Sequence, residues 1–592
     1  MNSKNLPVPR STNEGLPSDV TFTTGKGYLV IGNVHLGADP RILQTMASYA
    51  RYYNMEVIHL GKLITDEEKR MEESRRLRIR TWENGLEERQ TALDTADTPS
   101  SVDKIQRQIE KMSLDIESDV VESALLEGFQ NCRLESLVHH FGKISIVVND
   151  EQHFPGLDSY VSQSNGNITK HDSEFHLGLH LMLAAIHPAG DKAGHQPISN
   201  IAFRYFRSMK DSFIVPHGAP SLQSFKAEGI NKARNFFSTG SLHFEAVPKR
   251  ASELGFTTNR MPAAVAVFID TVTGEFHPRH VHIDFADGQF ETGIFILDDG
   301  LAFMEQGAVI ELKSADKGMF ATDTHAPYEN RGVVGCVRVG NLLHEPEEFI
   351  DGGDTADFES VNRHAKGPGA LEGKRLMNCL STMARVLDAY TNNQPSIKKK
   401  TLLDSNHAVW VDNFIEMNMC LKGLLDWKAL SQSIFKGWKV ILRDGGDDAL
   451  AHRFGDLALR HGDAENLRDA VNGSFPKYLC GHWHSTTTFR RGAACGAATN
   501  LAPKYVGTNL TSWTNAFAFL SKYKGIASFH IANVLYDKPE GGWKELDPFT
   551  HKARFCYRNK IYSVPFHVYA SERAAGKVST TGPGLSLVMR EA

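Results

Sequence analysis

The segment that determines the fold class is GYLVIGNVHLGADPRILQTMASYARYYNMEVIHLG, residues 27–61. It contains an apolar run that ends in a loop, then a stretch typical of a helix, then a second apolar run. A strand, a helix and another strand in this order form the unit from which layered α/β folds are built. We therefore predict that an α/β fold begins near residue 27.

Further strands and a second unit of the same kind define the domain organisation. Apolar runs typical of strands lie at 143–150, 212–218 and 263–271, and a β-rich stretch covers 290–312. The segment KGMFATDTHAP, residues 317–327, begins a second strand-to-loop unit, which places a domain boundary near residue 313. A chain of 592 residues is also too long for one core. We predict four regions: a flexible polar arm at 1–20, a first domain at 21–313, a second domain at 314–570 and a flexible tail at 571–592.

A highly charged insertion interrupts the first domain at about 65–120. Four apolar residues recur at helical spacing in its second part: Ile105, Ile109, Met112 and Ile116. The segment TADTPSS, residues 95–101, has turn chemistry and separates this part from the first. We predict a helical hairpin that projects from the α/β body as a solvated insertion. The alternative is a contact surface for a homo-oligomer, or a clamp.

We interpret two pairs of histidines as structural residues and not as metal ligands. His176 and His180 have the spacing of one helical face, but the glutamate of a zinc-binding H-E-x-x-H motif is missing, so we interpret this segment as a packed helix. His280 and His282 would share one face of a strand, at the surface or in the core.

Composition limits the class of protein. A net charge of −5 gives no global indication of a nucleic-acid or membrane partner, so any such contact must come from a local patch. Seven unclustered cysteines fit free thiols in a reducing compartment. The N-terminus lacks the apolar core of a signal peptide, and no apolar run is long enough to span a membrane. We predict a cytoplasmic protein without a membrane partner.

Five short motifs in the second half carry carboxylate, amide and imidazole side chains, and four of the five follow an apolar run. They are MFATDTHAP with Asp323 and His325, FIDGGDTADFES with Asp354 and Asp357, TLLDSNHAVW with Asn406 and His407, LALRHGDAE with His461, and YLCGHWHS with His482 and His484. Loops at the carboxyl ends of strands are where α/β sheets place ligand sites. An alternating pair such as D-x-H directs both side chains to one face of an extended segment. Each motif alone is a weak signal, but the ordered set predicts a metal site.

This ordered set resembles the calcineurin-like metallophosphoesterase superfamily over about 160 residues. The resemblance implies a four-layer β-sandwich flanked by helices and two divalent cations. One cation would be held by Asp323, His325, Asp354 and His484, and the other by Asp354, Asn406, His461 and His482. It also implies that His407 lies over the scissile phosphate. Two positions depart from the family pattern: Ala408 replaces an acid that orients a ligand, and Ser405 replaces a glycine.

The chemistry of these residues also agrees with the interpretation as a two-metal phosphoesterase. Two divalent cations about 3.5–4 Å apart can clamp a phosphate for in-line displacement and activate a water molecule. A shared carboxylate, here Asp354, holds so short a separation against the repulsion between the ions. A histidine such as His407 can supply a proton to the leaving oxygen at physiological pH. Oxygen and imidazole ligands without thiolate favour manganese, with iron, zinc or magnesium as alternatives.

The substrate is harder to predict than the reaction. Three groups of residues near the motifs are candidate contacts to substrate phosphates, with surface pairing as the alternative: Arg363 and His364; Lys398, Lys399 and Lys400; Arg490 and Arg491. The size, the hairpin and the basic clusters favour a polymer, and the arrangement resembles phage-encoded members of the superfamily, which implies a DNA nuclease acting in the cytoplasm of an infected bacterium. The alternatives are a phosphomonoesterase, a nucleotide phosphodiesterase, or a binding scaffold that has lost the chemistry.

The first half repeats the order of motifs in a weaker form. Asn33 and His35 match Asp323 and His325; Gly61 and Lys62 match Gly353 and Asp354; Asn149 and Asp150 match Asn406 and His407; His217 and Gly218 match His461 and Gly462; Gly240, Ser241 and His243 match Gly481, His482 and His484. Lysine at the place of the bridging aspartate would repel two cations. We predict a duplicated fold whose first copy has lost its metals, with an unrelated α/β domain as the alternative.

Overall fold

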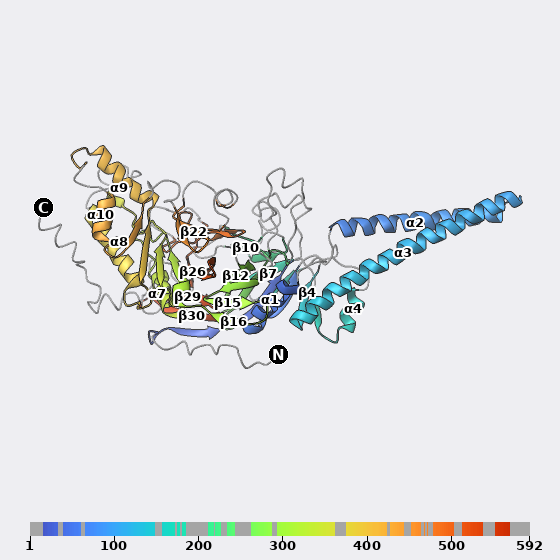
Figure 1. The fold of residues 1–592 in the computed structure, drawn as a ribbon, viewed down its shortest axis with the longest axis horizontal. Helices are drawn as coiled ribbons and strands as arrows, with labels where there is room; N and C mark the ends of the chain where they lie inside the picture. The colour runs from blue at the N-terminus through green and yellow to red at the C-terminus, as the bar shows by residue number, and fades with distance from the viewer. Residues whose placement is uncertain are drawn as a thin grey trace.

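The structure is a computed structural model of the whole chain (Figure 1). It describes residues 16–32, 40–60, 66–96, 98–148, 157–171, 174–177, 180–184, 211–217, 220–225, 234–242, 262–286, 293–361, 375–422, 427–442, 451–462, 467, 471, 477–501, 512–536, 551–566 and 568. Most of the predicted arm at 1–20 and all of the predicted tail at 571–592 lie outside this part of the chain.

Two six-stranded sheets have the same topology. In each sheet, four parallel strands are followed by two antiparallel strands. The first sheet has the order β5 (Ile168–His171), β4 (Ile144–Val147), β3 (Glu56–Leu60), β2 (Lys26–Ile31), β11 (Ala263–Ile269) and β12 (Phe276–His282). The second has the order β20 (Lys439–Ile441), β19 (Lys399–Leu403), β18 (Glu348–Asp351), β17 (Lys317–Ala321), β26 (Ala516–Tyr523) and β27 (Ile526–Asn533). The strands predicted at 143–150 and 263–271 are confirmed as β4 and β11.

A ten-stranded sheet joins the two halves. Its order is β21 (His452–Phe454), β22 (Leu457–Arg460), β23 (Tyr478–Cys480), β25 (Gly492–Ala494), β24 (Thr487–Phe489), β9 (Ser221–Phe225), β10 (Arg234–Ser238), β8 (Ser212–Val215), β7 (Leu181–Ala184) and β6 (Glu174–Leu177). The two central strands, β9 and β24, are antiparallel, with Leu222 opposite Thr488. On either side of this seam the remaining strands follow in equivalent order and direction.

Two small sheets exchange strands between the halves. One has the order β13 (Asp284–Phe285), β14 (Ile294–Asp298), β15 (Leu301–Met304) and β16 (Val309–Glu311). The other has the order β28 (Leu535–Tyr536), β29 (Lys552–Tyr557), β30 (Lys560–Pro565) and β1 (Thr21–Thr24). Each described strand of the first half thus has a counterpart numbered fifteen higher in the second. The repeat begins anew at β16, a few residues before the predicted boundary at 313.

Buried apolar side chains fill the space between the sheets, and helices cover the outer faces. In the second half this core includes Phe320, Ile350, Leu459 and Leu479, all fully buried. The helices α1 (Pro40–Tyr52) and α4 (Leu157–Gln163) pack on the first six-stranded sheet, and α7 (Arg331–His344) and α8 (Leu376–Thr391) pack on the second. Other helical elements of this half are η5 (Ser314–Asp316), which directly precedes β17, η6 (Glu359–Val361), α9 (Asn406–Met417) and α10 (Trp427–Ile434). The fold is mixed α/β, as predicted.

The predicted hairpin projects as a long two-helix arm, α2 (Asp66–Asp94) and α3 (Pro99–Phe141), shown in blue and cyan in Figure 1. Thr98 caps α3 by accepting a hydrogen bond from the Ser101 backbone N–H. Forty-three residues make α3 about 65 Å long. The helix continues past the predicted end near residue 120 because Leu134 and Leu137 at its base are buried in the core of the first half.

One predicted element is wrong. The segment around His176 and His180 is not a packed helix: His176 lies on β6 and His180 directly precedes β7, and both side chains are exposed. Leu177 on β6 and Leu181 on β7 are direct partners in an antiparallel strand pair, and both are buried. His280 and His282 lie on β12, as predicted; His282 is buried and His280 is half-buried. No helix in the described part of the chain has the length and apolar character needed to cross a membrane.

Candidate metal centre

The seven predicted ligands converge at the carboxyl edge of the second half. Asp323 and His325 follow β17, Asp354 follows β18, and Asn406 begins α9 shortly after β19. His461 follows β22, and His482 and His484 follow β23 of the facing sheet. The carboxyl ends of parallel strands meet at one edge, so five loops that are distant in sequence become neighbours.

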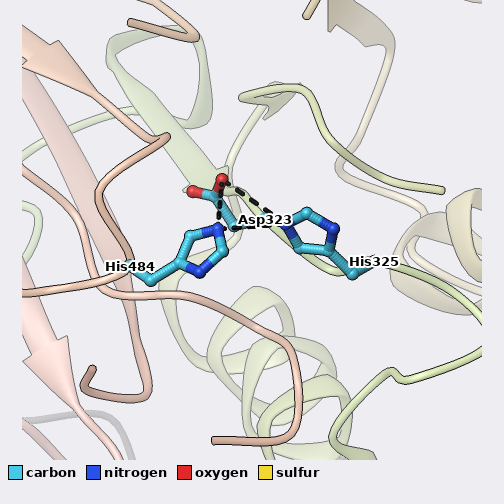
Figure 2. A group of neighbouring side chains, drawn as sticks. All are labelled: Asp323, His325 and His484. Carbon is cyan, nitrogen blue, oxygen red and sulfur yellow. Dashed lines mark hydrogen bonds and ion pairs between the residues drawn. The ribbon is translucent and has the colours of Figure 1, made fainter. Parts of the chain in front are cut away.

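Three of these residues form a first cluster, in which the side chains of Asp323, His325 and His484 point toward one another (Figure 2). Nε2 of His484 lies 3.2 Å from Oδ1 of Asp323. Nε2 of His325 lies 3.0 Å from Nε2 of His484 and 4.0 Å from Oδ1 of Asp323. All three side chains are buried.

The other residues form a second cluster around Asp354. Nε2 of His461 lies 3.2 Å from Oδ2 of Asp354 and 2.7 Å from Oδ1 of Asn406. Nδ1 of His482 lies 3.1 Å from the same Asn406 oxygen. The Asp354 carboxylate also faces the first cluster, because its Oδ2 lies 3.9 Å from Nε2 of His325. Asp354 is therefore the residue common to both groups.

These separations fit the coordination of divalent cations. Bonds of about 2.0–2.2 Å to imidazole nitrogen and carboxylate oxygen place neighbouring ligand atoms of one ion about 3 Å apart. The hydrogen bonds behind the ligands also suit a cation: Nδ1 of His461 donates to the Gly352 carbonyl at 2.9 Å, and Nδ1 of His325 faces the Asp357 carboxylate at 3.0 Å. Each bond leaves the lone pair on Nε2, directed into its cluster. The residues present therefore fit two divalent cations.

Positive φ angles recur among the ligands of the centre. Five of the seven ligands have positive φ angles: Asp323 (52°), His325 (48°), Asp354 (48°), His482 (73°) and His484 (56°). Residues with a Cβ avoid this left-handed region, at a cost of roughly 1–2 kcal/mol each. Such strain persists where a site requires it, and it gathers here at the ligands.

Burial and charge set the protonation of the centre. Burial disfavours the charged form of Asp354, but the His461 and His407 imidazoles outweigh burial and hold the pKa of this carboxyl well below its usual range. Burial also disfavours a charged His461, yet the Asp354 carboxylate raises the pKa of His461 to about 9. In the absence of cations, a proton on His461 thus offsets the buried carboxylate. A cation that binds here must displace that proton.

His407 stands beside the shared aspartate, partly exposed to solvent. Its Nδ1 lies 3.2 Å from the Asp357 backbone carbonyl, which can only accept a hydrogen bond, so Nδ1 carries the proton. Its Nε2 then faces Oδ2 of Asp354 at 3.8 Å. The Trp410 ring stacks on the imidazole, with centroids 4.0 Å apart and planes at 25°. Nε2 is therefore the ring atom positioned to exchange a proton with a substrate.

The two departures from the family pattern have different consequences. Ser405 has an extended backbone, with φ of −136°, so this position does not need glycine. Ala408 is buried and lines a small cavity behind Asp354 together with Asp404 and Trp427. The Asp404 carboxylate accepts hydrogen bonds from the Ser405 backbone N–H at 3.0 Å and from the Trp427 indole at 3.1 Å. Asp404 thus fixes the start of the loop that carries Asn406.

The predicted phosphate contacts do not converge on the centre. Lys399 and Lys400 begin β19, whereas Asn406 follows its other end, so this basic cluster, with Lys398, lies at the opposite edge of the sheet. Lys399 pairs with Glu347 at 2.8 Å. The prediction is therefore wrong for these lysines at this centre, because proximity in sequence ignored the direction of the strand.

The remaining predicted contacts differ among themselves. Arg491 is buried and donates to the Asp284 carboxylate at 2.9 Å and to the Ile283 carbonyl, so it joins the halves and the prediction is wrong for it. Arg490 is partly buried over the Phe489 ring and stays a prediction. Arg363 and His364 lie outside the described residues.

Two tryptophans beside the ligands were not anticipated. Trp410 lies three residues after His407 in α9, a spacing that places two side chains on one helical face. Trp513 lies against His484, with ring centroids 4.3 Å apart. It precedes β26, and no pattern in the sequence around it signals a site.

The strand order corrects the motif matches within the first half. β8 lies between β7 and β10, as β23 lies between β22 and β25. His217, two residues after β8, therefore corresponds to His482, and the predicted match with His461 is wrong by one strand. The match of Gly240 and Ser241 with the loop after β23 is wrong for the same reason, because β10 corresponds to β25. The other candidate positions of the first copy lie outside the described residues: Asn33, His35, Gly61, Lys62, Asn149, Asp150, Gly218 and His243.

A scan against protein-family models finds no model that matches this chain, and a search of curated proteins finds no matching sequence. Assignment of an activity therefore depends on the motifs and on the geometry of the centre.

Proposed function

We propose that the second half is a two-metal phosphoesterase that hydrolyses phosphodiester bonds, and that its substrate is DNA. The observation that supports this most is the position of Asp354, whose carboxylate faces both ligand clusters. When bound, two divalent cations, with manganese the best match to these oxygen and imidazole ligands, supply a clamp for the phosphate and activate the attacking water.

The chain's own residues would orient these parts and move the final proton. Asp357 orients His325 through a hydrogen bond of 3.0 Å, and its backbone carbonyl fixes the tautomer of His407. Because Nδ1 already carries a proton, His407 would have to be an imidazolium for its Nε2 to give a proton to the leaving oxygen when the phosphorus–oxygen bond breaks. Burial lowers the pKa of His407, whereas the nearby Asp354 carboxylate favours the imidazolium. Burial of the carboxylates keeps bulk water from competing for the ligand atoms.

The choice of DNA rests on the resemblance to phage-encoded members of the superfamily and on the size of the protein. In that setting the enzyme would degrade host DNA in the cytoplasm of an infected bacterium. The phosphomonoesterase, the nucleotide phosphodiesterase and the non-catalytic scaffold are alternatives that one set of assays separates.

The test compares plasmid DNA with p-nitrophenyl phosphate, each with manganese and then with excess EDTA. We expect manganese-dependent loss of the plasmid and little release of nitrophenol. Cleavage of the monoester alone would refute the nuclease, and activity on neither substrate in a manganese-loaded protein would favour the scaffold.

His407→Ala tests the proton donor. Removal of a positioned general acid typically costs about 10²- to 10⁴-fold in rate. We expect a loss of kcat of this order with the manganese content, measured by inductively coupled plasma mass spectrometry, unchanged. A variant that keeps full activity would refute the role of His407.

A further inference from the structure

Trp513 is a tryptophan at the edge of the metal centre whose indole is not buried in the core. Its ring meets the ligand His484 at an interplanar angle of 76°, and its side chain is partly exposed to solvent. Within the described residues, the indole N–H makes no hydrogen bond. A tryptophan in the interior normally satisfies its N–H, so this indole is available to a ligand.

The backbone that carries Trp513 is fastened to the ligand loop on both sides of the indole. The Ser485 hydroxyl donates to the Ser512 carbonyl at 2.8 Å. The Thr514 backbone N–H donates to the His484 carbonyl at 2.8 Å, and the Thr486 backbone N–H donates to the Thr514 hydroxyl at 2.8 Å. These bonds hold the indole at a fixed position beside the centre, so little conformational freedom would be lost when a ligand binds.

The neighbouring tryptophans have other partners. Trp483, between the two histidines of the ligand loop, packs on the apolar cluster beneath β23. Trp410 is buried under His407. Trp513 thus differs from Trp410 in being partly exposed, and from Trp483 in that its ring contacts a ligand and does not pack on that apolar cluster.

We propose that Trp513 stacks on a nucleobase next to the scissile phosphate, so that the enzyme acts on nucleotides whose base is unstacked, as in single strands or frayed ends. This inference rests on the proposed nuclease activity and specifies its substrate. An aromatic side chain accepts the face of any base, which gives selection for nucleic acid without selection for sequence. Such stacking changes affinity on the order of 10- to 100-fold for each base.

The test uses dinucleotides, because each contains a single phosphodiester. One is dithymidine monophosphate, and two analogues carry a base-free tetrahydrofuran in place of the 5′ or the 3′ thymidine. We expect the wild type with manganese to prefer the natural dinucleotide over one analogue on the order of 10- to 100-fold in kcat/KM. Trp513→Ala should remove most of this preference, and Trp513→Phe should keep part of it.

Trp438→Ala is the matched control, because this indole is also partly exposed but lies at the opposite edge of the sheet, near Lys400. It should keep the preference of the wild type. Equal losses on all three dinucleotides in Trp513→Ala would show that Trp513 only supports His484, and unchanged preference would also overturn the proposal. A wild type that cleaves none of the dinucleotides or plasmid DNA would instead refute the nuclease itself.

Discussion

Asp354 is the residue on which the metal centre depends most. Two glycines precede it, and both are required by close packing: a Cβ on Gly352 would lie 2.4 Å from the Phe320 ring, and one on Gly353 would lie 2.9 Å from His461. The turn is thus shaped to bring a single carboxylate between two groups of ligands. Asp357, three residues later, orients His325 through a hydrogen bond with its Nδ1.

Asp354→Asn and Asp357→Asn separate these two roles. An amide offers one ligand oxygen and no negative charge, so Asp354→Asn should reduce bound manganese from two ions to one or none and abolish activity. Asp357→Asn keeps both sites but should weaken manganese binding by about 10- to 100-fold, the usual effect of losing a residue that orients a ligand. Calorimetric titration with manganese measures both stoichiometry and affinity, and two tight ions in Asp354→Asn would contradict the shared role.

The convergence of the candidate ligand side chains could be predicted from the sequence, because the motifs are short, four of the five follow an apolar run, and their order resembles a known superfamily. The basic contacts could not, because charge alone does not show where a side chain ends up. Lys399 is close to a motif in sequence, yet it lies at the end of β19 that is far from the candidate centre. Arg491 forms a buried ion pair with Asp284.

Among the elements, the arm formed by α2 and α3 is held together by polar and apolar contacts along its length. Arg78 donates two hydrogen bonds to Asp119, at 2.9 and 3.0 Å, and the helices approach so closely that a Cβ on Gly85 would lie 2.7 Å from Met112. Two leucines on the arm, Leu77 and Leu114, are 67% and 66% exposed. Leu77 lies on α2 and Leu114 on α3, so they are the apolar side chains with which to test whether the arm contacts another chain.

Replacing residues 79–118 by a short turn tests what the arm does. The Arg78–Asp119 pair and the buried base of α3 remain, so we expect the manganese centre and the melting temperature of the body to be retained. If the arm joins copies of the chain, the alternative to the predicted solvated insertion, the mass measured by light scattering should fall. Leu77→Ser with Leu114→Ser is the milder control, and a mass unchanged by either variant would contradict the oligomer.

The start of the arm and its turn were predictable because they depend on local charge and turn chemistry. The end of α3 was not, since its last turns are fixed by contacts of Leu134 and Leu137 with strands far away in sequence. The strands β6 and β7 were predicted to be a helix for a related reason. Two short segments with apolar residues, separated by three residues, fit the period of a helix as well as the period of two that a strand has.

At the scale of the whole molecule, a buried charge network lies where the two halves meet. Arg279 on β12 donates to Asp298 and Asp299, each at 2.7 Å, and Asp299 also lies 2.7 Å from His530 on β27. These acids and this histidine could form a metal site by composition, but the guanidinium already supplies the positive charge. The network therefore joins the halves and does not constitute a second metal centre.

Several buried histidines make the stability of the molecule depend on pH. Burial lowers the pKa of His59 and of His280 to about 4, against about 6.5 in the unfolded chain. Between these values the unfolded chain binds a proton that the folded protein excludes, so the free energy of unfolding falls as the pH is lowered, by up to roughly 1.4 kcal/mol per pH unit for each histidine. Urea unfolding at pH 7, 6 and 5 should show this decline.

His280→Gln should make the decline less steep by about one proton, because glutamine does not titrate and can still donate to the Ser238 carbonyl that lies 2.9 Å from the histidine. The control is His176→Gln on the exposed face of β6, which should leave the slope unchanged. A slope that does not change in His280→Gln would contradict the prediction.

The order of motifs predicted a duplication, but it did not show which strand of the first half corresponds to which strand of the second. Weak motifs can be shifted by one strand without any local conflict, as happened for His217, and only hydrogen-bonded strand order fixes the correspondence. The shared ten-stranded sheet could not be foreseen at all, because the pairing of β9 with β24 joins residues more than 260 positions apart.

The exchange of strands has a consequence for synthesis on the ribosome. β1 leaves the ribosome early, but its partner strand β30 is translated near the end. The partner of β9 is β24, which follows the last candidate ligand, His484. The nascent first half therefore carries two open edges until nearly the whole polypeptide has been translated. The candidate metal centre is therefore complete only after His484 has been translated, and the partner of β1 follows still later.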